Sequence, residues 1–585
     1  MNTPTHSLFA PIIRLLLAFV AMLPVSALAQ GTDWAFQATG ISGQSLLPTV
    51  YNHVTSDASG NLYVSSNVVD STEFGSFTIH GYPVVPGVHL AAEYLAKFNS
   101  QGEPQWVQTF TGPDGLLRIN DLATDPQGNV YFTGHVSNQV TIDTISIVTN
   151  FTSGELIVAK FNPQGEVQWV KTSDSQPGFS SSTGASIAIS PAGDVVVSGY
   201  VSNEVVFDSV TLDGTSNQLL VSYDSDGNLN WVNSYGTQNP LFLDSQIGID
   251  GAGNIYWVGS CASTASSNIA TFDTIQVDVE HGAAFLAKFD EDGAIQWLNS
   301  WLGAINNEFP VAAGDLAVDR NTNAVYIGGV FRGSFEIAGT TLTETSALAS
   351  DMFVARFSSD GTAQWARQSH GPAEPVRMYD LSVNSQGELF LAARVFNSAG
   401  LTGFTLGEGA NAATITLDGP TNGIVAKYTT NGDLGWMKAV LGTGGNEIQS
   451  LVAIDANTAA ITGFFTGTAT LGTNTLVAGP GSNSSNIFVA TCTGNATTGF
   501  GDVEETTFGA KVYPNPADRA FTVELEDPTT ISQLNLMNSQ GQVIRSIPHP
   551  TSFEVIQTTG LSAGIYLLRI HQGGVVKSQK VIVQR

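Results

Sequence analysis

The amino-acid sequence predicts an all-β protein, a seven-bladed β-propeller followed by a small immunoglobulin-like β-sandwich. Three observations carry this prediction. An eleven-residue stretch ending in Trp recurs six times, a second hairpin pattern recurs seven times, and neither pattern occurs after residue 493. Hairpins repeated at a regular interval are typical of a repeat architecture and not of a helical enzyme.

The first repeated stretch reads AKFNPQGEVQW at residues 159–169. It combines an alternating apolar run, a turn containing Gly and a second strand opening on Trp, which together predict a β-hairpin. Its copies end at Trp106, Trp169, Trp231, Trp297, Trp365 and Trp436, with 62 to 71 residues between successive Trp. We interpret a Trp at the same place in every copy as a core residue and not as a carbohydrate platform. The cation that precedes the aromatic residue, such as Lys97, is interpreted as a structural ion pair or a packed stem.

The second repeated stretch lies upstream of the first and reads DLATDPQGNVYFTG at residues 121–134. Asp bonds its own backbone and Gly supplies a positive φ, so this stretch also predicts a hairpin. One repeat therefore has four strands, here 121–125, 129–134, 156–161 and the strand that contains Trp169. Four antiparallel strands repeated seven times are the pattern of a β-propeller. The first strand of each repeat is expected to be innermost, because its third residue is small in every copy.

The seventh repeat supplies only three strands, at 451–455, 459–465 and 486–492. No Trp strand follows Cys492, which occupies the aromatic position of its repeat. A matching segment, Thr32-Asp33-Trp34-Ala35-Phe36, stands at the other end of the chain. We therefore expect residues 33–39 to complete the seventh blade, within a propeller that spans residues 30–492. Such a closure would remove the last free sheet edges.

The repeats resemble bacterial propeller repeats of the SBBP type. The resemblance is carried by DPQGNVYFTG at 125–134 and FLAKFDEDGAIQW at 285–297. It implies a propeller fold and an extracellular setting, and it implies no particular activity.

After a linker at 493–507, residues 508–585 form a second, shorter all-β unit in which the repeat is absent. Alternating runs at 521–525, 533–537, 542–547, 564–570 and 580–583 predict a compact sandwich. The unit resembles the type A C-terminal sorting domain of the type IX secretion system of Bacteroidota. The matching residues are Pro514, Asn515, Pro516, Gly564, Tyr566 and Lys580. The resemblance implies recognition by the outer-membrane export machinery, followed by removal of the domain and attachment to surface lipopolysaccharide, or release.

The first 29 residues are expected to be a signal peptide. An apolar core follows Arg14, and Ala27 and Ala29 form a small-residue cleavage site before Gln30. The apolar core is too short to span a membrane, and no second apolar run of that kind follows. We therefore expect a secreted or cell-surface protein without a transmembrane helix.

Charge is distributed unevenly over the chain, whose formal net charge is −29. Residues 31–507 contain 13 basic and 45 acidic side chains, while residues 508–585 contain 7 basic and 5 acidic ones. An acidic surface repels phosphate backbones, so nucleic acid is not expected as a partner.

No motif for a metal, a nucleotide or another cofactor stands in a suitable context, and none is expected. The acidic turns around Asp224 and Asp290 lack the further ligands of a calcium loop and are interpreted as hairpin turns. Long insertions between the second and third strands, such as 136–155, are expected to be loops on one face of the ring. Binding sites favour such loops. The first residue of each innermost strand is expected at the channel mouth on that face. The candidate binding residues are therefore His53, Asp121, Gln246, Asp315 and Asp380.

The sequence thus favours an exported binding or scaffold protein whose ligand is a glycan or another protein. The alternative is an extracellular polysaccharide hydrolase or lyase that uses carboxylates at the channel mouth, since glycosidase acids from separate blades leave no local motif. A structural surface coat without a small ligand is a third possibility. No catalytic residue is assigned.

Overall fold

The computed structural model describes residues 35–40, 52–494 and 510–584, apart from short gaps. The gaps lie at 69–70, 75, 86–87, 91, 113, 150–153, 176–179, 213–216, 236–240, 263–268, 279–282, 303–310, 346–349, 371–375, 398–402, 472–473, 479–485, 515, 526–527, 539–542 and 573–574. The predicted signal peptide, with Ala27, Ala29 and Gln30, lies outside the described residues. The chain divides into two units, Met1–Thr498 and Gly499–Arg585, and each is described by itself.

The prediction of an all-β protein is confirmed. The helical elements of the described residues are two 3₁₀ turns, Gly409–Asn411 and Pro528–Thr530. No helix in the described part of the chain is long and apolar enough to cross a membrane.

In its described residues, the first unit contains seven sheets that share one antiparallel order, and we number them sheet 1 to sheet 7 along the chain. Sheet 1 consists of β2 (His53–Ser56), β3 (Leu62–Val68), β8 (Ala92–Phe98) and β9 (Pro104–Phe110). Sheet 2 consists of β10 (Leu116–Thr124), β11 (Val130–Ser137), β14 (Glu155–Phe161) and β15 (Val167–Thr172). Sheet 3 consists of β17 (Ser181–Ile189), β18 (Val195–Ser202), β21 (Asn217–Tyr223) and β22 (Leu229–Tyr235). Sheet 4 consists of β23 (Leu241–Ile249), β24 (Ile255–Ala262), β27 (Ala283–Phe289) and β28 (Ile295–Leu302).

The remaining three sheets repeat this order. Sheet 5 consists of β29 (Val311–Asp319), β30 (Ala324–Phe331), β33 (Asp351–Phe357) and β34 (Ala363–Gln368). Sheet 6 consists of β35 (Val376–Val383), β36 (Leu389–Phe396), β39 (Thr421–Tyr428) and β40 (Leu434–Val440). Sheet 7 consists of β41 (Asn446–Ala453), β42 (Thr458–Phe465), β45 (Asn486–Thr493) and, as its fourth strand, β1 (Ala35–Gly40).

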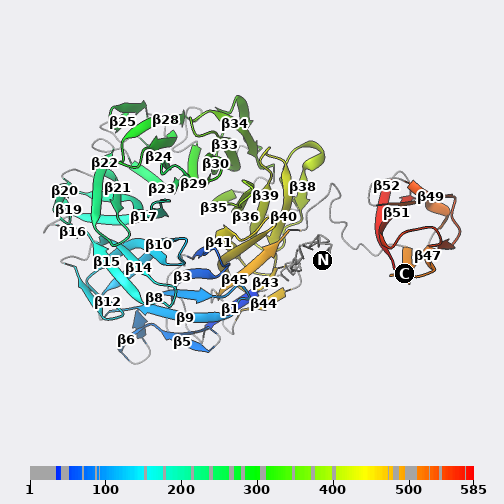
Figure 1. Cartoon of the computed structure of the whole chain (residues 1–585), viewed down its shortest axis with the longest axis horizontal. Coiled ribbons are helices and arrows are strands. Elements are labelled where there is room, and N and C mark those ends of the chain that lie inside the picture. The colour runs from blue at the N-terminus through cyan, green and yellow to red at the C-terminus, as the bar shows by residue number, and fades with distance from the viewer. Residues whose placement is uncertain are drawn as a thin grey trace, which may run out of the picture. The chain divides into compact units, whose positions relative to one another are not determined.

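The first strands of the seven sheets lie next to one another in a closed series, and the sheets radiate from them (Figure 1). We call these first strands the inner strands. We call the end of the unit where each inner strand turns into its second strand the turn side, and the opposite end the strap side.

The turns on the turn side are built by Asp side chains. In sheet 2, Asp125 Oδ1 accepts hydrogen bonds from the backbone N–H groups of Gln127 and Asn129, at 3.0 and 2.9 Å. Its Oδ2 accepts a hydrogen bond from the hydroxyl of Tyr131 at 2.9 Å. A carboxylate that satisfies its own turn in this way fixes the hairpin register locally.

Sheets 1 to 5 are each fastened to the next sheet by the repeated Trp. The indole N–H donates to a backbone carbonyl in the turn of the following sheet: Trp106 to Pro163, Trp169 to Ser225, Trp231 to Glu291, Trp297 to Ser359 and Trp365 to Thr430, at 2.9 to 3.3 Å. We call this contact the Trp clasp. Lys97, Lys160 and Lys288 donate to the same carbonyl oxygens as their neighbouring Trp, at 2.9 to 3.1 Å. These Trp and Lys side chains therefore hold adjacent sheets together.

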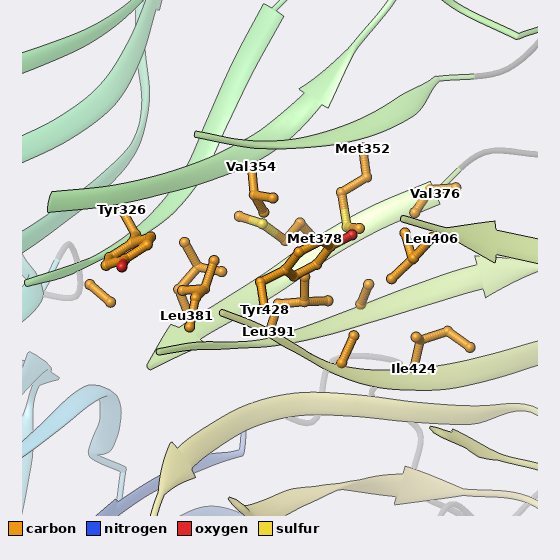
Figure 2. Close-up of a cluster of buried hydrophobic side chains, with 14 of the residues drawn as sticks. Tyr326, Met352, Val354, Val376, Met378, Leu381, Leu391, Leu406, Ile424 and Tyr428 are labelled. Atoms are coloured by element: carbon orange, nitrogen blue, oxygen red, sulfur yellow. The ribbon is translucent and has the colours of Figure 1, made fainter. Parts of the chain in front are cut away.

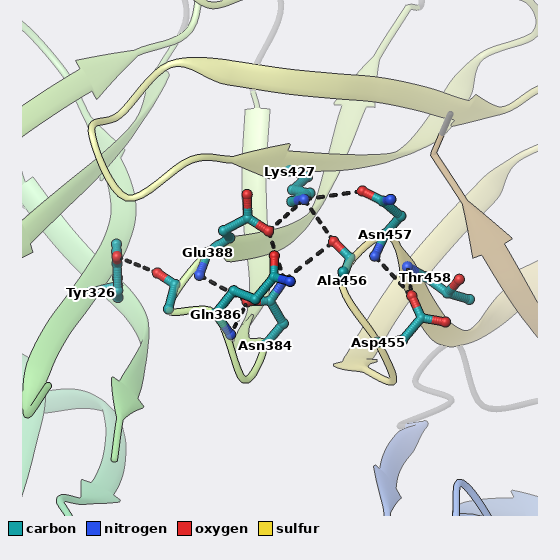
Figure 3. A network of polar contacts seen from close by, with 10 residues as sticks. Tyr326, Asn384, Gln386, Glu388, Lys427, Asp455, Ala456, Asn457 and Thr458 are labelled. Carbon is teal, nitrogen blue, oxygen red and sulfur yellow. Dashed lines mark hydrogen bonds and ion pairs between the residues drawn. The ribbon is translucent and has the colours of Figure 1, made fainter. Parts of the chain in front are cut away.

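Figure 3 shows a network of polar contacts that joins sheets 6 and 7. Lys427 forms an ion pair with Glu388 at 2.6 Å and donates to the carbonyl of Ala456, also at 2.6 Å. Asn384 donates to Glu388 and to the same carbonyl, at 2.9 and 3.3 Å. The Lys427 side chain is 8% exposed, so this ion pair is shielded from solvent.

Apolar side chains fill the space between neighbouring sheets. Figure 2 shows the cluster between sheets 5 and 6, where Tyr326 and Val354 of sheet 5 pack near Met378, Leu391 and Tyr428 of sheet 6. All five of these side chains are buried. The alternation of the strands places one such row on each sheet face, so the core of the unit is a series of layers between sheets.

The insertions between the second and third strands are hairpins and not the expected loops. They are β4 (Ser71–Phe74) with β5 (Phe77–His80), β12 (Gln139–Ile142) with β13 (Ile145–Val148), β19 (Val205–Phe207) with β20 (Val210–Leu212), β25 (Ile269–Phe272) with β26 (Ile275–Asp278), β31 (Ser334–Ile337) with β32 (Thr340–Thr343), β37 (Phe404–Leu406) with β38 (Ala413–Ile415) and β43 (Thr468–Leu471) with β44 (Asn474–Val477). We call them straps. Sheet 1 carries a second hairpin, β6 (Tyr82–Val85) with β7 (Val88–Leu90).

Straps pair with the preceding sheet. Thr141 of the sheet 2 strap bridges Thr111, which follows the outer strand of sheet 1. Equivalent bridges join Thr405 to His370 and Thr470 to Leu441, and β19 pairs with the short strand β16 (Asp174–Ser175). β4 pairs with β1 in the same way, which extends sheet 7 to six strands. The straps thus form a second set of links between sheets, at the strap side.

The first and last described segments of the unit lie side by side. β1 pairs antiparallel with β45, with Ala35 opposite Ala490 and Ala38 opposite Ile487. Trp34 and the rest of the segment before Ala35 lie outside the described residues.

The second unit has two sheets. One consists of β46 (Ala510–Tyr513), β47 (Ala520–Leu525) and β50 (Phe553–Gln557), and the other of β49 (Val543–Pro548), β48 (Ile531–Met537), β51 (Gly564–Gln572) and β52 (Val575–Val583). Buried apolar side chains from both sheets, including Phe521, Val523, Leu536 and Leu568, form one core. The sequence missed β46 and β50 and began the last strand five residues late.

Candidate functional site

All five candidate channel residues lie on inner strands, but only His53 begins its strand. Asp121 and Gln246 stand five residues, and Asp315 and Asp380 four residues, after the starts of β10, β23, β29 and β35. The prediction that these residues open their strands is therefore wrong for four of the five. A β-bulge just before Asp121, Asp315 and Asp380 interrupts the alternation, and an additional stretch of strand precedes it.

The three carboxyl groups contact the inner strand of the next sheet. Asp121 Oδ2 accepts hydrogen bonds from Ser186 Oγ and the Ile187 N–H of sheet 3, at 2.8 and 2.9 Å. Asp380 Oδ2 accepts the same pair of bonds from Ser450 Oγ and the Leu451 N–H of sheet 7, at 2.6 and 2.8 Å. The two bonds are equivalent, so they are part of the repeat.

Two hydroxyl groups carry this series of contacts further. Ser186 Oγ accepts from the Ile247 N–H of sheet 4 at 3.3 Å, and Ser450 Oγ accepts from the Val54 N–H of sheet 1 at 3.1 Å. We call the residues at this position the belt. Its members are His53, Asp121, Ser186, Gln246, Asp315, Asp380 and Ser450. In sheet 7 the equivalent residue is Ser450, because it lies four residues before the turn at 454–458, as Asp121 lies four residues before the turn at 125–129.

Asp315 and Asp380 are brought together in the belt and hydrogen-bond to each other. Burial and the negative charge of Asp380 raise the pKa of Asp315 well above its ordinary value. Burial also raises the pKa of Asp380, against the stabilising bonds from Asp315, Ser450 and backbone N–H groups. The pair therefore retains a proton under conditions in which two separate carboxyl groups would lose both.

Asp121 lies apart from this pair but is affected by its charge. Burial raises its pKa from 3.8 to about 7, although hydrogen bonds from Ile187, Ser186 and Leu122 lower it. The charge of Asp380 makes a smaller contribution in the raising direction.

The two other candidates have no such contacts. Burial lowers the pKa of His53 to about 4, so the imidazole is neutral at pH 7, and its Nε2 is buried without a hydrogen-bond partner among the described residues. Gln246 is half-buried on β23. In the part of the chain that the structure describes, no group of three or more His, Cys, Asp or Glu side chains is arranged to hold a metal ion.

Sequence reasoning missed a cluster of charged and aromatic residues on the strap side of sheet 6. It consists of Arg377 and Tyr379 on β35, Arg394 on β36 and Glu447 on β41 of sheet 7. Tyr379 is the bulged residue that precedes Asp380, and its hydroxyl donates to Glu447 Oε2 at 3.0 Å. Arg394 forms an ion pair with Glu447 Oε1. Two Arg at these positions, in a unit with so few basic residues, were the signal in the sequence.

The two ends of the first unit differ. On the turn side, Arg320 reaches across the ends of two inner strands and donates to the carbonyl oxygens of Ile249 and Ile189, at 3.3 and 2.5 Å. On the strap side, four exposed apolar side chains lie on four different straps: Val148, Val210, Ile269 and Val477. Leu116, at the strap-side start of β10, is also exposed.

The residues of the predicted sorting motif lie in the second unit. Pro514 and Pro516 flank Asn515, which is outside the described residues, and Pro514 follows a cis peptide bond. Gly564 begins β51, and the buried Tyr566 donates its hydroxyl to the Ser562 carbonyl at 3.0 Å. Lys580 lies opposite Leu567 in the β51–β52 pair.

Residues 511–584 match the family model described as the secretion system C-terminal sorting domain. The presence of this domain indicates export by type IX secretion to the cell surface or the surrounding medium.

Comparison of the whole chain with known proteins gives more distant likenesses. An uncharacterized WD repeat-containing protein of Acanthamoeba polyphaga mimivirus is 24% identical over 410 residues, which are 64% of this chain. The chain spans only 26% of that relative's length.

Solved structures give low scores. A protein of unknown function from Dyadobacter fermentans is 11% identical, with a TM-score of 0.33, and 64% of this chain covers 94% of that one. Polysaccharide lyase Uly1 is 8% identical, with a TM-score of 0.36, and 80% of this chain covers 94% of that one. TM-scores of this size do not establish a common fold or activity.

Proposed function

We propose that the first unit is a seven-bladed β-propeller of residues 30–492, with residues 33–39 as the outer strand of its seventh blade. The support is the closed series of seven inner strands and the pairing of β1 with β45. The second unit is proposed to be an immunoglobulin-like sandwich, on the support of its two sheets around one core.

The proposed function is that of an exported, cell-surface or secreted binding or scaffold protein, whose glycan or protein ligand contacts the strap side. The observation that carries this proposal is the set of exposed apolar side chains on the straps, one each from sheets 2, 3, 4 and 7. Exposed apolar side chains on hairpins at the same end of a rigid scaffold favour a binding surface there. Five of the six repeated Trp are engaged in clasps and Trp436 is buried, so they are not available as sugar platforms.

A binding screen tests this proposal. The secreted chain is applied to glycan and extracellular-protein arrays, together with the double variants Val148→Ser/Val477→Ser on the strap side and Gln127→Ser/Gln164→Ser on the turn side. Loss of a bound ligand in the strap variant alone is expected. If both variants bind the ligand as well as the wild type does, the binding surface lies elsewhere on the protein. If no ligand is found on the arrays, the result favours a structural coat.

The sorting domain is proposed to be removed after export, by cleavage within the linker at 493–507, with the propeller then attached to surface lipopolysaccharide or released. Mass spectrometry of the protein from the cell surface and the medium tests this. A surface protein that retains residues 508–585 would contradict removal.

A second candidate function is that of an extracellular polysaccharide hydrolase or lyase. The observation in its favour is the Asp315–Asp380 pair, because two carboxyl groups with separated pKa values can act as acid and base. Turnover of a polysaccharide panel that is lost in Asp121→Asn, Asp315→Asn or Asp380→Asn would support it. Saturable binding without turnover would exclude it for the polysaccharides in the panel.

A further inference from the structure

Two guanidinium groups of sheet 6 stand directly opposite each other. Arg377 of β35 and Arg394 of β36 are cross-strand partners, so their side chains lie on the same face of the sheet. Both positions are on the strap side of the bulge at Tyr379. Like charges in this relationship are destabilising. The pair is conspicuous because residues 31–507 contain only 13 basic side chains.

The surroundings neutralise only one of the two charges. Arg394 has its ion pair with Glu447, and their side chains are 16% and 9% exposed. Arg377 is exposed and has no ion-pair or hydrogen-bond partner among the described residues. Its guanidinium lies 5.3 Å from the centre of the Tyr379 ring, and that of Arg394 lies 5.7 Å from the same centre. The group of Arg377, Arg394 and Glu447 therefore has a net charge of +1.

The hydrogen-bonding capacity of the pair is also incomplete. Arg394 Nε is buried and has no acceptor in the part of the chain that the structure describes. Buried donors are normally paired, and leaving one unpaired costs about 1–3 kcal/mol. An oxyanion at the exposed Arg377 and the 16%-exposed Arg394 would offset the repulsion, because planar guanidiniums bind carboxylates with charge-assisted hydrogen bonds.

We propose that Arg377, Tyr379 and Arg394 form a binding site for the carboxylate of an acidic sugar, a uronic acid residue of an extracellular polysaccharide. This inference rests on the proposed binding role of the strap side and names its ligand class. A uronic acid brings one carboxylate per ring together with hydroxyl donors, which suit a unit with 45 acidic side chains in residues 31–507. An aspartate-rich peptide brings several adjacent charges and few hydrogen-bond donors, so the net charge of −29 opposes it more than it opposes a single uronic acid residue.

The test uses the full secreted chain and calorimetric or NMR titration with sodium D-glucuronate, sodium acetate, D-glucose and a short oligo-aspartate peptide. Glucuronate is expected to bind more tightly than acetate, and glucose is expected not to bind. Arg377→Gln is expected to weaken glucuronate binding by roughly 10- to 100-fold, the loss of one charge-assisted contact. The matched control is Arg332→Gln, which removes an exposed charge between β30 and the strap strand β31 and is expected to leave binding unchanged.

Stability gives a second measurement. If the Arg pair serves a ligand, Arg377→Gln relieves repulsion and its melting temperature without ligand rises or stays the same. A lowered melting temperature would assign Arg377 to the fold and overturn the proposal.

Two further outcomes overturn the proposal: equal glucuronate affinity in Arg377→Gln and wild type, or tighter binding of oligo-aspartate than of glucuronate. An array ligand that binds Arg377→Gln as well as wild type would leave the strap-side binding role standing while removing this site. If glucuronate binding depends on Arg377 but the arrays show no ligand, this site is supported, and the natural ligand is one that the arrays lack.

Discussion

The indole N–H of Trp106 donates a hydrogen bond to the carbonyl oxygen of Pro163, 3.0 Å away in the next sheet. Trp436 occupies the equivalent position in sheet 6, but its indole N–H is buried without a partner among the described residues. The corresponding part of sheet 7 ends at Thr493 and Gly494, and the residues that follow lie outside the described part of the chain.

This difference gives a matched pair of variants. Trp106→Phe loses a hydrogen bond between sheets and is expected to lower the free energy of unfolding by about 1 kcal/mol more than Trp436→Phe, which loses none. Chemical denaturation of both variants measures the difference. Equal losses would mean that only the packing of the indole matters.

Gly165 gives a test of how closely the clasps are packed. Its φ is +87°, and a Cβ there would lie 2.8 Å from Cδ2 of Trp106. Gly165→Ala is therefore expected to be destabilising through both the backbone and the clash, and Gly339→Ala is the control. Gly339 has a φ of +65° with open space around it, so alanine there is expected to cost only the backbone term of about 1–2 kcal/mol. Equal effects of the two substitutions in thermal unfolding would contradict the close packing.

Deletion of residues 30–40 removes β1, the strand that pairs with β45. This exposes the edge of β45 and also takes away the partner of β4. We expect the melting temperature of the whole first unit to fall and the variant to aggregate more readily, because a free edge strand pairs with other chains. Scanning calorimetry and light scattering measure both effects. An unchanged melting temperature would mean that the ring does not depend on this strand.

Asp121 makes the stability of the first unit depend on pH. Its pKa in the folded state, about 7, is above its ordinary value of 3.8, so between these values the folded protein holds a proton that the unfolded chain has released. Stability contributed by the protonated carboxyl is therefore present below pH 4 and is lost as the pH rises to 7. Burial also raises the pKa of Glu93, to about 8, which acts in the same direction.

Asp121→Asn removes the Asp121 contribution, so the melting temperature of this variant is expected to fall less than that of the wild type between pH 5 and pH 8. Asp114→Asn, at an exposed carboxyl, is the control and is expected to follow the wild type. If the melting temperature of Asp121→Asn falls with pH as steeply as that of the wild type, the Asp121 carboxyl does not titrate between pH 5 and pH 8.

The repeats made the sheets predictable from the sequence. The spacing of Trp106 and its equivalents, with Gly in each turn, correctly predicted antiparallel sheets of four strands. The straps were missed, although Val140, Ile142 and Ile147 alternate around a two-residue turn at Asp143. Strands of four residues gain little by themselves, and their pairing partners lie in another sheet, which local patterns do not reveal.

The candidate site was less predictable than the sheets. Charged residues on inner strands could be found by alignment, but the bulges that place them within the strands could not. The contacts of Asp121 and Asp380 involve Ser186 and Ser450, which are 65 and 70 residues away, and the repeat pattern does not reveal these pairings. The opposition of Arg377 and Arg394 depends on the register of β35 against β36. This register is set by the bulge at Tyr379, a feature with no mark in the sequence.

The backward reach of the straps bears on how the protein is made. Each strap for which a bridge is described attaches to a sheet whose residues have already left the ribosome, so repeats can be added one after another in chain order. β1 is the exception, since it is synthesised first and its partner β45 comes about 450 residues later. In a newly made chain, this strand therefore stays without β45 as its partner until the last repeat has been synthesised.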